Sequence, residues 1–190
     1  AAKVGLFAVG AAATAGFGKA ISAASDLEEQ VNKTSVVFGK SSGDVLAWSK
    51  TTAEAFGISQ RAALEAAGTF GNMLVPMGFG RDEAAKMSKR FVELAADMAS
   101  FNNASPEETL AALRSGLSGE AEPLRRFGVL LDAAKVKAEA MALGLYKGKG
   151  ALSDTAKASA TTSLIFKQTA DAQGDVGRTA DSVANSQRRA

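Results

Sequence analysis

A run of apolar side chains between residues 82 and 101 recurs at steps of three and four positions, and it constrains the fold of this chain more than any other feature. Steps of this kind place side chains on one face of an α-helix, and here they follow the heptad spacing of coiled coils. The spacing predicts a single helix whose apolar stripe packs on other helices. A coiled coil and burial against helices of the same domain both remain open. The stripe consists of Ala84, Met87, Phe91, Leu94, Met98 and Phe101.

The composition extends this prediction to the rest of the chain. Its 190 residues include only three Pro, aromatic residues make up 6%, and 46% of the residues are apolar. Much of that apolar share is Ala, the residue with the highest helix propensity, and small side chains let helices approach closely. The sequence therefore predicts an all-α fold, an Ala-rich multi-helix domain.

Three parts are expected along the chain. Residues 1–38 pass from an apolar stretch into an amphipathic pattern without a breaker, which predicts one long N-terminal helix. Residues 39–150 are expected to form a helical core region, in which Ser105 and Glu108 have the spacing of a capping box. Residues 151–190 alternate small and polar residues around a sparse apolar set, which predicts a helical C-terminal arm.

The apolar segment Val4–Ala24 has three interpretations. Its uncharged part ends at Gly18 and is about 15 residues long, shorter than the roughly 20 that span a bilayer. A tightly packed helix is the favoured interpretation, and a segment that contacts a host membrane or a cleaved signal are the alternatives.

Several function classes are excluded by what the sequence lacks. The chain has no His and no Cys, which removes disulfides, imidazole or thiolate metal ligands, and catalytic triads built on His. A net charge of +2 gives no strong electrostatic attraction to nucleic acid, so no specific nucleic-acid sequence is expected as a partner. Any enzyme would have to use Asp, Glu, Lys, Ser or Tyr146. We expect no catalytic residue, no cofactor and no metal site.

The densest group of special residues lies in "SGLSGEAEPLRRFGVLL", residues 115–131. Gly116 and Gly119 are only three positions apart and no Lys-Ser/Thr pair follows them, which excludes a phosphate-binding loop. Two glutamates two positions apart point to different faces of a helix, which argues against a convergent acid pair. We predict instead a turn module in which Ser118 caps a short helix and Glu122 pairs with Arg125 and Arg126. The residues singled out are Gly116, Gly119, Glu120, Glu122, Pro123, Arg125, Arg126, Phe127 and Gly128.

The string "ALRSGLSGEAEPLRRFGV", residues 112–129, closely resembles the signature of tail tape measure proteins of long-tailed bacteriophages. The flanking strings "FGNMLVPMG", "LAADMASFNNASPEETL" and "GDVGRTADSVANSQRR" also resemble segments of that family, in the expected order. The resemblance covers most of the chain, from Ser25 to Arg189. Family members are much longer than this chain, so the chain is expected to be a fragment. They also often have an aromatic residue where Val176 stands.

The resemblance implies a structural role and no enzymatic activity. Tape measure proteins are helical chains in the lumen of the tail tube; their length sets tail length, and they leave the tube before DNA ejection. The implied partners are the tail tube protein, tail-tip or baseplate proteins, tail assembly chaperones and further copies of the chain, as a trimer or hexamer. The implied location is the virion, and the host cytoplasm during assembly.

Three alternatives follow from the same residues. A peptidoglycan-degrading activity would use Glu120 as its acid. A membrane-inserting ejection segment would use Val4–Ala24, and it is compatible with the tape measure role. A helical adaptor unrelated to phage is the third alternative.

Overall fold

In the computed structural model, residue 22 and residues 24–179 are described, so Val4–Ala24 lies almost wholly outside the described part, as do residues 180–190. The described chain contains helices and turns but no strand, which confirms the predicted all-α class. None of the helices in it is both long and apolar enough to cross a membrane. Residues 24–38 are helical, and after them come η1 (Gly39–Ser41), α2 (Ser42–Ser49), α3 (Thr52–Phe56), α4 (Gln60–Leu74), α5 (Arg81–Phe101), α6 (Pro106–Ser118), α7 (Glu122–Arg125), α8 (Ala133–Ala142), α9 (Asp154–Gln168) and α10 (Asp175–Arg178).

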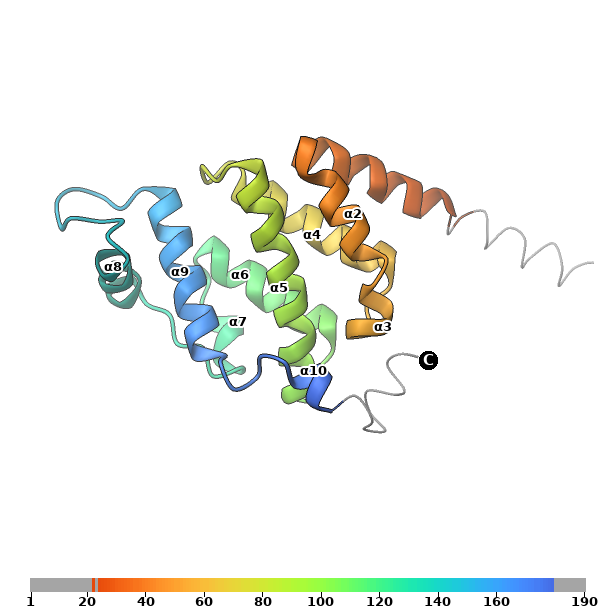
Figure 1. The fold of residues 1–190 in the computed structure, drawn as a ribbon. Helices are drawn as coiled ribbons and strands as arrows, with labels where there is room; N and C mark the ends of the chain where they lie inside the picture. Colours follow the sequence, from red (N-terminus) through yellow and green to blue (C-terminus); the bar gives the residue numbers. More distant parts are fainter. Residues whose placement is uncertain (1–21, 23, 180–190) are drawn as a thin grey trace, which may run out of the picture.

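Helix α5 is the central element of the fold, with α4, α6 and α10 packed against it (Figure 1). Four members of the predicted stripe are buried on it, namely Ala84, Phe91, Leu94 and Met98, and Met87 is half-buried. The stripe therefore packs inside the domain, against helices of the same chain. Its last member was predicted wrongly: Phe101 is 54% exposed, because α5 ends there and the chain turns away before α6 covers it.

Three aromatic rings meet where α4, α5 and α9 face one another. The rings of Phe70 and Phe91 stack with centroids 4.9 Å apart, and the ring of Phe166 lies 5.6 Å from that of Phe91. Phe70 and Phe91 have no exposed surface. This cluster joins the part of the chain that was expected to form the core to the part that was expected to form an arm.

The N-terminal helix is fixed to the core through its last two turns. Thr34 and Phe38 are fully buried, and Phe38 lies against Gly71 of α4. The guanidinium group of Arg81 donates hydrogen bonds to the carbonyl oxygens of Val36 and Val37, which have no helical partner at the end of a helix. Leu27 and Val31, on the preceding turns, are partly buried against the same core, and the helix extends to one side of the molecule (Figure 1).

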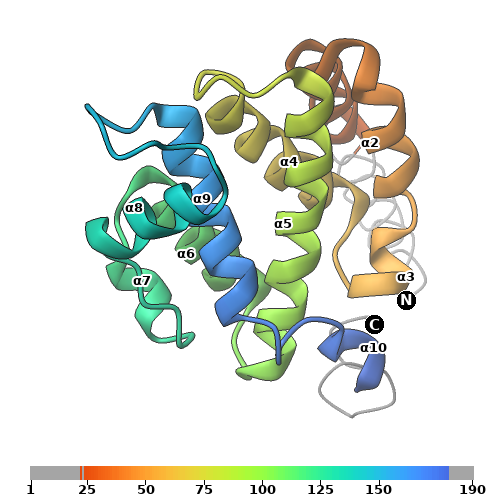
Figure 2. The same cartoon turned by 60° about the vertical axis from the view of Figure 1, so that its left-hand side comes forward.

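The predicted C-terminal arm is instead part of the packed domain over its described residues. Ala158, Ile165, Ala172 and Val176 are buried in the same core as the α4–α5 pair. Helix α9 packs against α8 and α6, and α8 and α9 lie side by side in both views (Figure 2). The sparse apolar pattern was misleading because alanines on α9 allow close backbone approach, so burial there needs few large side chains.

Candidate functional site

The predicted turn module is built between the end of α6 and residue 129. Helix α6 ends at Gly119, whose φ of 98° suits Gly, and the backbone N–H of Glu120 donates to the carbonyl of Ser115 over 2.8 Å. One helical turn, α7, follows and ends at Arg125, and Gly128 at φ 79° ends the turn that comes after it. The predicted order of glycine turn, charged helical turn and glycine turn is therefore observed. The proposed Ser118 cap is wrong, because its hydroxyl donates to the carbonyl of Arg114 inside α6.

Apolar side chains anchor this module to the core. Leu124 and Val129 are fully buried and Phe127 is 8% exposed. A Cβ atom at Gly116 would lie 2.2 Å from Cδ1 of Leu124, so only Gly at this position lets α7 rest on α6. Gly116 and the apolar residues of the motif thus have a packing role, whereas Gly119 and Gly128 supply the positive φ of the two turns.

The charged residues of the motif lie at the surface. Arg125 pairs with Glu122 over 2.9 Å, as predicted, and both side chains are more than half exposed. Arg126 was predicted to share Glu122, but it lies 3.4 Å from Glu108 at the start of α6. Glu108 and Ser105 form the predicted capping box, and both of its hydrogen bonds are present. The Ser105 backbone N–H and then Arg126 lower the pKa of the Glu108 carboxyl.

Replacing Gly116 by Ala is expected to destabilise the domain by about 1–3 kcal/mol, because the new methyl group overpacks the contact with buried Leu124. Gly43→Ala is the matched control, since a Cβ atom there has nothing within 4 Å. The control is expected to leave stability unchanged or to raise it by up to about 1 kcal/mol. Urea unfolding followed by circular dichroism compares the two, and equal midpoints would contradict the packing role of Gly116.

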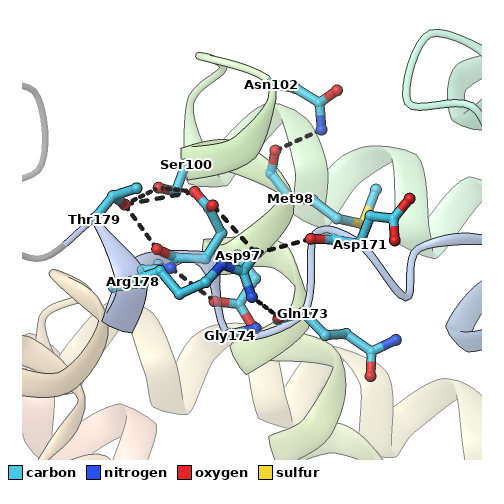
Figure 3. Close-up of polar contacts among 11 residues, drawn as sticks. Asp97, Met98, Ser100, Asn102, Asp171, Gln173, Gly174, Arg178 and Thr179 are labelled. Carbon is cyan, nitrogen blue, oxygen red and sulfur yellow. Dashed lines mark hydrogen bonds and ion pairs between the residues drawn. The ribbon is translucent and has the colours of Figure 1, made fainter.

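The segment that begins at Gly174 is held by a carboxylate on α5. Asp97 is 8% exposed and accepts hydrogen bonds from the backbone N–H groups of Gly174 over 2.7 Å and Val176 over 3.1 Å (Figure 3). Ser100, one turn further along α5, donates to the Asp175 carboxylate over 2.7 Å. We call this set of contacts the α5–α10 clasp. It explains why residues 174–179 follow α5 closely.

Arg178 stabilises the turn that precedes α10 in this clasp. Its guanidinium group donates to the carbonyl oxygens of Gln173 over 2.7 Å and Asp171 over 2.8 Å, and it lies 3.3 Å from the Asp175 carboxylate (Figure 3). Charge-assisted bonds of this kind fix the turn that leads into α10. Sequence reasoning missed Asp97, for which the only signal was a carboxylate among the apolar residues of "LAADMAS".

A second buried carboxylate joins α8 to α9. Glu139 accepts hydrogen bonds from the Lys167 ammonium and the Ser163 hydroxyl, each over 2.6 Å, and its side chain is 10% exposed. Lys167 first and then Ser163 lower the pKa of the Glu139 carboxyl below its ordinary value of 4.5. Both partners stabilise the ionised form, so the contact needs a charged carboxylate.

Glu139→Gln is expected to cost about 1.5 kcal/mol at pH 7, where the wild-type carboxylate is fully ionised. Because the folded-state pKa is lowered, this contribution is complete above pH 4.5 and is lost as the pH falls through the folded-state pKa. The difference in unfolding free energy between wild type and variant should therefore shrink below pH 4.5. Urea titrations from pH 3 to 7 measure it, with exposed Glu54→Gln as the control, and a pH-independent difference would contradict the assignment.

The charged groups described above hold helices and turns together. Exposed Glu120 precedes α7 in the motif, and the buried carboxylates Asp97 and Glu139 are engaged by backbone or side-chain donors. Within residues 24–179, no group of three or more metal-ligating side chains is placed to hold a metal ion. Comparison of the chain with protein-family models, with curated proteins and with solved structures finds no match.

Proposed function

We propose that this chain is a segment of a tail tape measure protein, a structural component of a long-tailed phage virion. The observation that carries the proposal is the string from Gly119 to Gly128, "GEAEPLRRFG", which resembles the family signature over ten consecutive positions. The protein would set tail length during assembly in the host cytoplasm, occupy the lumen of the tail tube and assist DNA ejection. It would act without catalysis and without a cofactor.

The geometry of the motif supports a structural role. Its apolar residues and Gly116 are used for packing, as with Gly116 against Leu124, and Gly119 and Gly128 form its turns. Its ionic groups Glu122, Arg125 and Arg126 lie at the surface, where they are available to a neighbouring protein. The partners proposed from the family resemblance are the tail tube protein, tail-tip or baseplate proteins, assembly chaperones and other copies of the chain, in threes or sixes.

Tail length in the phage that encodes the chain provides the test. An in-frame duplication of the codons for residues 22–179 should lengthen the tail, as measured by electron microscopy of purified virions. An increment of about 1.5 Å per added residue would mean that the helices lie end to end in the tube, and a smaller increment that they stay packed. Both outcomes support the proposal.

A same-sized insertion in a tail-tip gene is the control and should leave the length unchanged. Tails of unchanged length from the duplication, in virions shown by mass spectrometry to contain the enlarged protein, would overturn the proposal.

A further inference from the structure

An apolar surface lies at the end of α8. Met141, Leu143 and Leu145 are 51%, 44% and 49% exposed, and residues 141–145 form an unbroken exposed stretch. Single exposed apolar residues are ordinary, but three within five positions form a patch that favours association. The loop that follows folds back on it, since a Cβ atom at Gly148 would lie 4.0 Å from Cε of Met141.

The patch continues into an open groove between α5 and α9. Leu143 lines this groove, which has a volume of about 550 Å³, together with apolar Phe79, Met87 and Phe166 and several polar side chains of α9. Apolar side chains from four separate segments therefore meet on one face. A groove of this kind is suited to the apolar side of a helix.

Cations lie both in this groove and in the loop that follows the patch. Arg90 lies over the Phe166 ring, with its guanidinium carbon 4.3 Å from the ring centroid. Lys147 and Lys149 are exposed in the loop after the patch, and neither forms an ion pair within the part of the chain that the structure describes. The one carboxylate in the lining of the groove is Glu83. The occupant should therefore carry apolar side chains next to negative charge.

The N-terminal helix of the same chain has this character. Asp26, Glu28 and Glu29 are exposed on its first described turns, and Lys33 is the only cation among residues 24–38. In the sequence they follow the segment Val4–Ala24, whose part up to Gly18 carries no charge. An apolar segment followed by three carboxylates complements an apolar patch followed by two exposed lysines.

The α8–α9 connection, which carries Lys147 and Lys149, and the N-terminal helix lie at opposite ends of the molecule in both views (Figures 1 and 2). We propose that the N-terminal segment of one copy, with Asp26, Glu28 and Glu29, docks in the α5–α9 groove of a second copy beside Lys147 and Lys149. Different surfaces of the two copies meet in this contact, so it is head-to-tail and can propagate.

Charge reversal tests this pairing. Sedimentation velocity of the 190-residue chain should show association that rises with protein concentration and weakens with salt. The variants Glu28→Lys/Glu29→Lys and Lys147→Glu/Lys149→Glu should each associate at least tenfold more weakly. An equimolar mixture of the two should associate again, because each reversed surface then finds its complement. Lys40→Glu/Lys50→Glu, which makes the same charge change at exposed sites elsewhere, should behave as wild type.

Three results would overturn the proposal. The first is a wild-type chain that stays monomeric at all concentrations, and the second is association that neither reversal weakens. The third is a mixture of the two variants that fails to associate although both remain folded by circular dichroism. Binding of a monomeric chain to vesicles of phosphatidylglycerol, lost in Lys147→Glu/Lys149→Glu, would assign the surface to lipid instead. None of these results depends on tail length, so they are distinguishable from failure of the proposed function.

Discussion

Replacing Phe91 by Ala is expected to lower the free energy of unfolding by about 3–5 kcal/mol, the largest effect of any single substitution considered for this chain. Phe91 is fully buried on the central helix and contacts the rings of Phe70 and Phe166. The substitution removes those ring contacts and leaves a cavity that the surrounding helices fill only in part. A loss of this size approaches the whole stability of many domains.

Phe101→Ala is the matched control, because it makes the same chemical change on the same helix. Phe101 is 54% exposed and is expected to change stability by less than about 0.5 kcal/mol. Urea unfolding curves for both variants give the comparison. Similar losses at the two positions would show that Phe101 is covered by another surface, as a coiled coil between chains would require.

Phe91 and Phe101 also show how far the fold could be predicted from the sequence. The period of the apolar residues located α5 to within one residue of its observed start, because an amphipathic helix is a local pattern. The capping box at Ser105 and Glu108 was predicted for the same reason, since cap and partner lie three residues apart. Phe101 belongs to the same periodic stripe as Phe91. Its exposure depends on the path of the chain from the end of α5 into α6, which the period of the apolar residues does not specify.

Contacts between distant segments were beyond sequence reasoning. Arg126 has Glu122 four positions before it, yet it pairs with Glu108, which the α6–α7 turn brings within 3.4 Å. Residues 151–179 looked too poor in large apolar side chains for a core, and their burial depends on alanines facing other helices. In the candidate site, the glycine turns and the Glu122–Arg125 pair were predictable, whereas Asp97 was not.

Asp97→Asn is expected to release the segment after residue 173 from α5 at a cost of about 3 kcal/mol, because one hydrogen bond to a charged acceptor is lost and the other becomes a weaker bond to a neutral oxygen. The carboxylate receives the backbone N–H groups of Gly174 and Val176 on its two oxygens. An amide of the same shape has one acceptor oxygen, so its NH₂ group must face one of these donors. The amide protons of Gly174 and Val176 should then exchange faster with solvent, by roughly a hundredfold for about 3 kcal/mol.

Asp171→Asn is the control for the loss of a negative charge near this clasp. Asp171 is exposed, and it contributes its backbone carbonyl, which accepts from Arg178 over 2.8 Å. The control should leave exchange at Val176 unchanged, since the carbonyl is retained. Equal acceleration in both variants would mean that net charge holds α10 in place. Acceleration in Asp97→Asn alone, with unchanged exchange in the α4–α5 core, would mean that two directed hydrogen bonds hold it there and that α10 can detach while the rest of the domain stays folded.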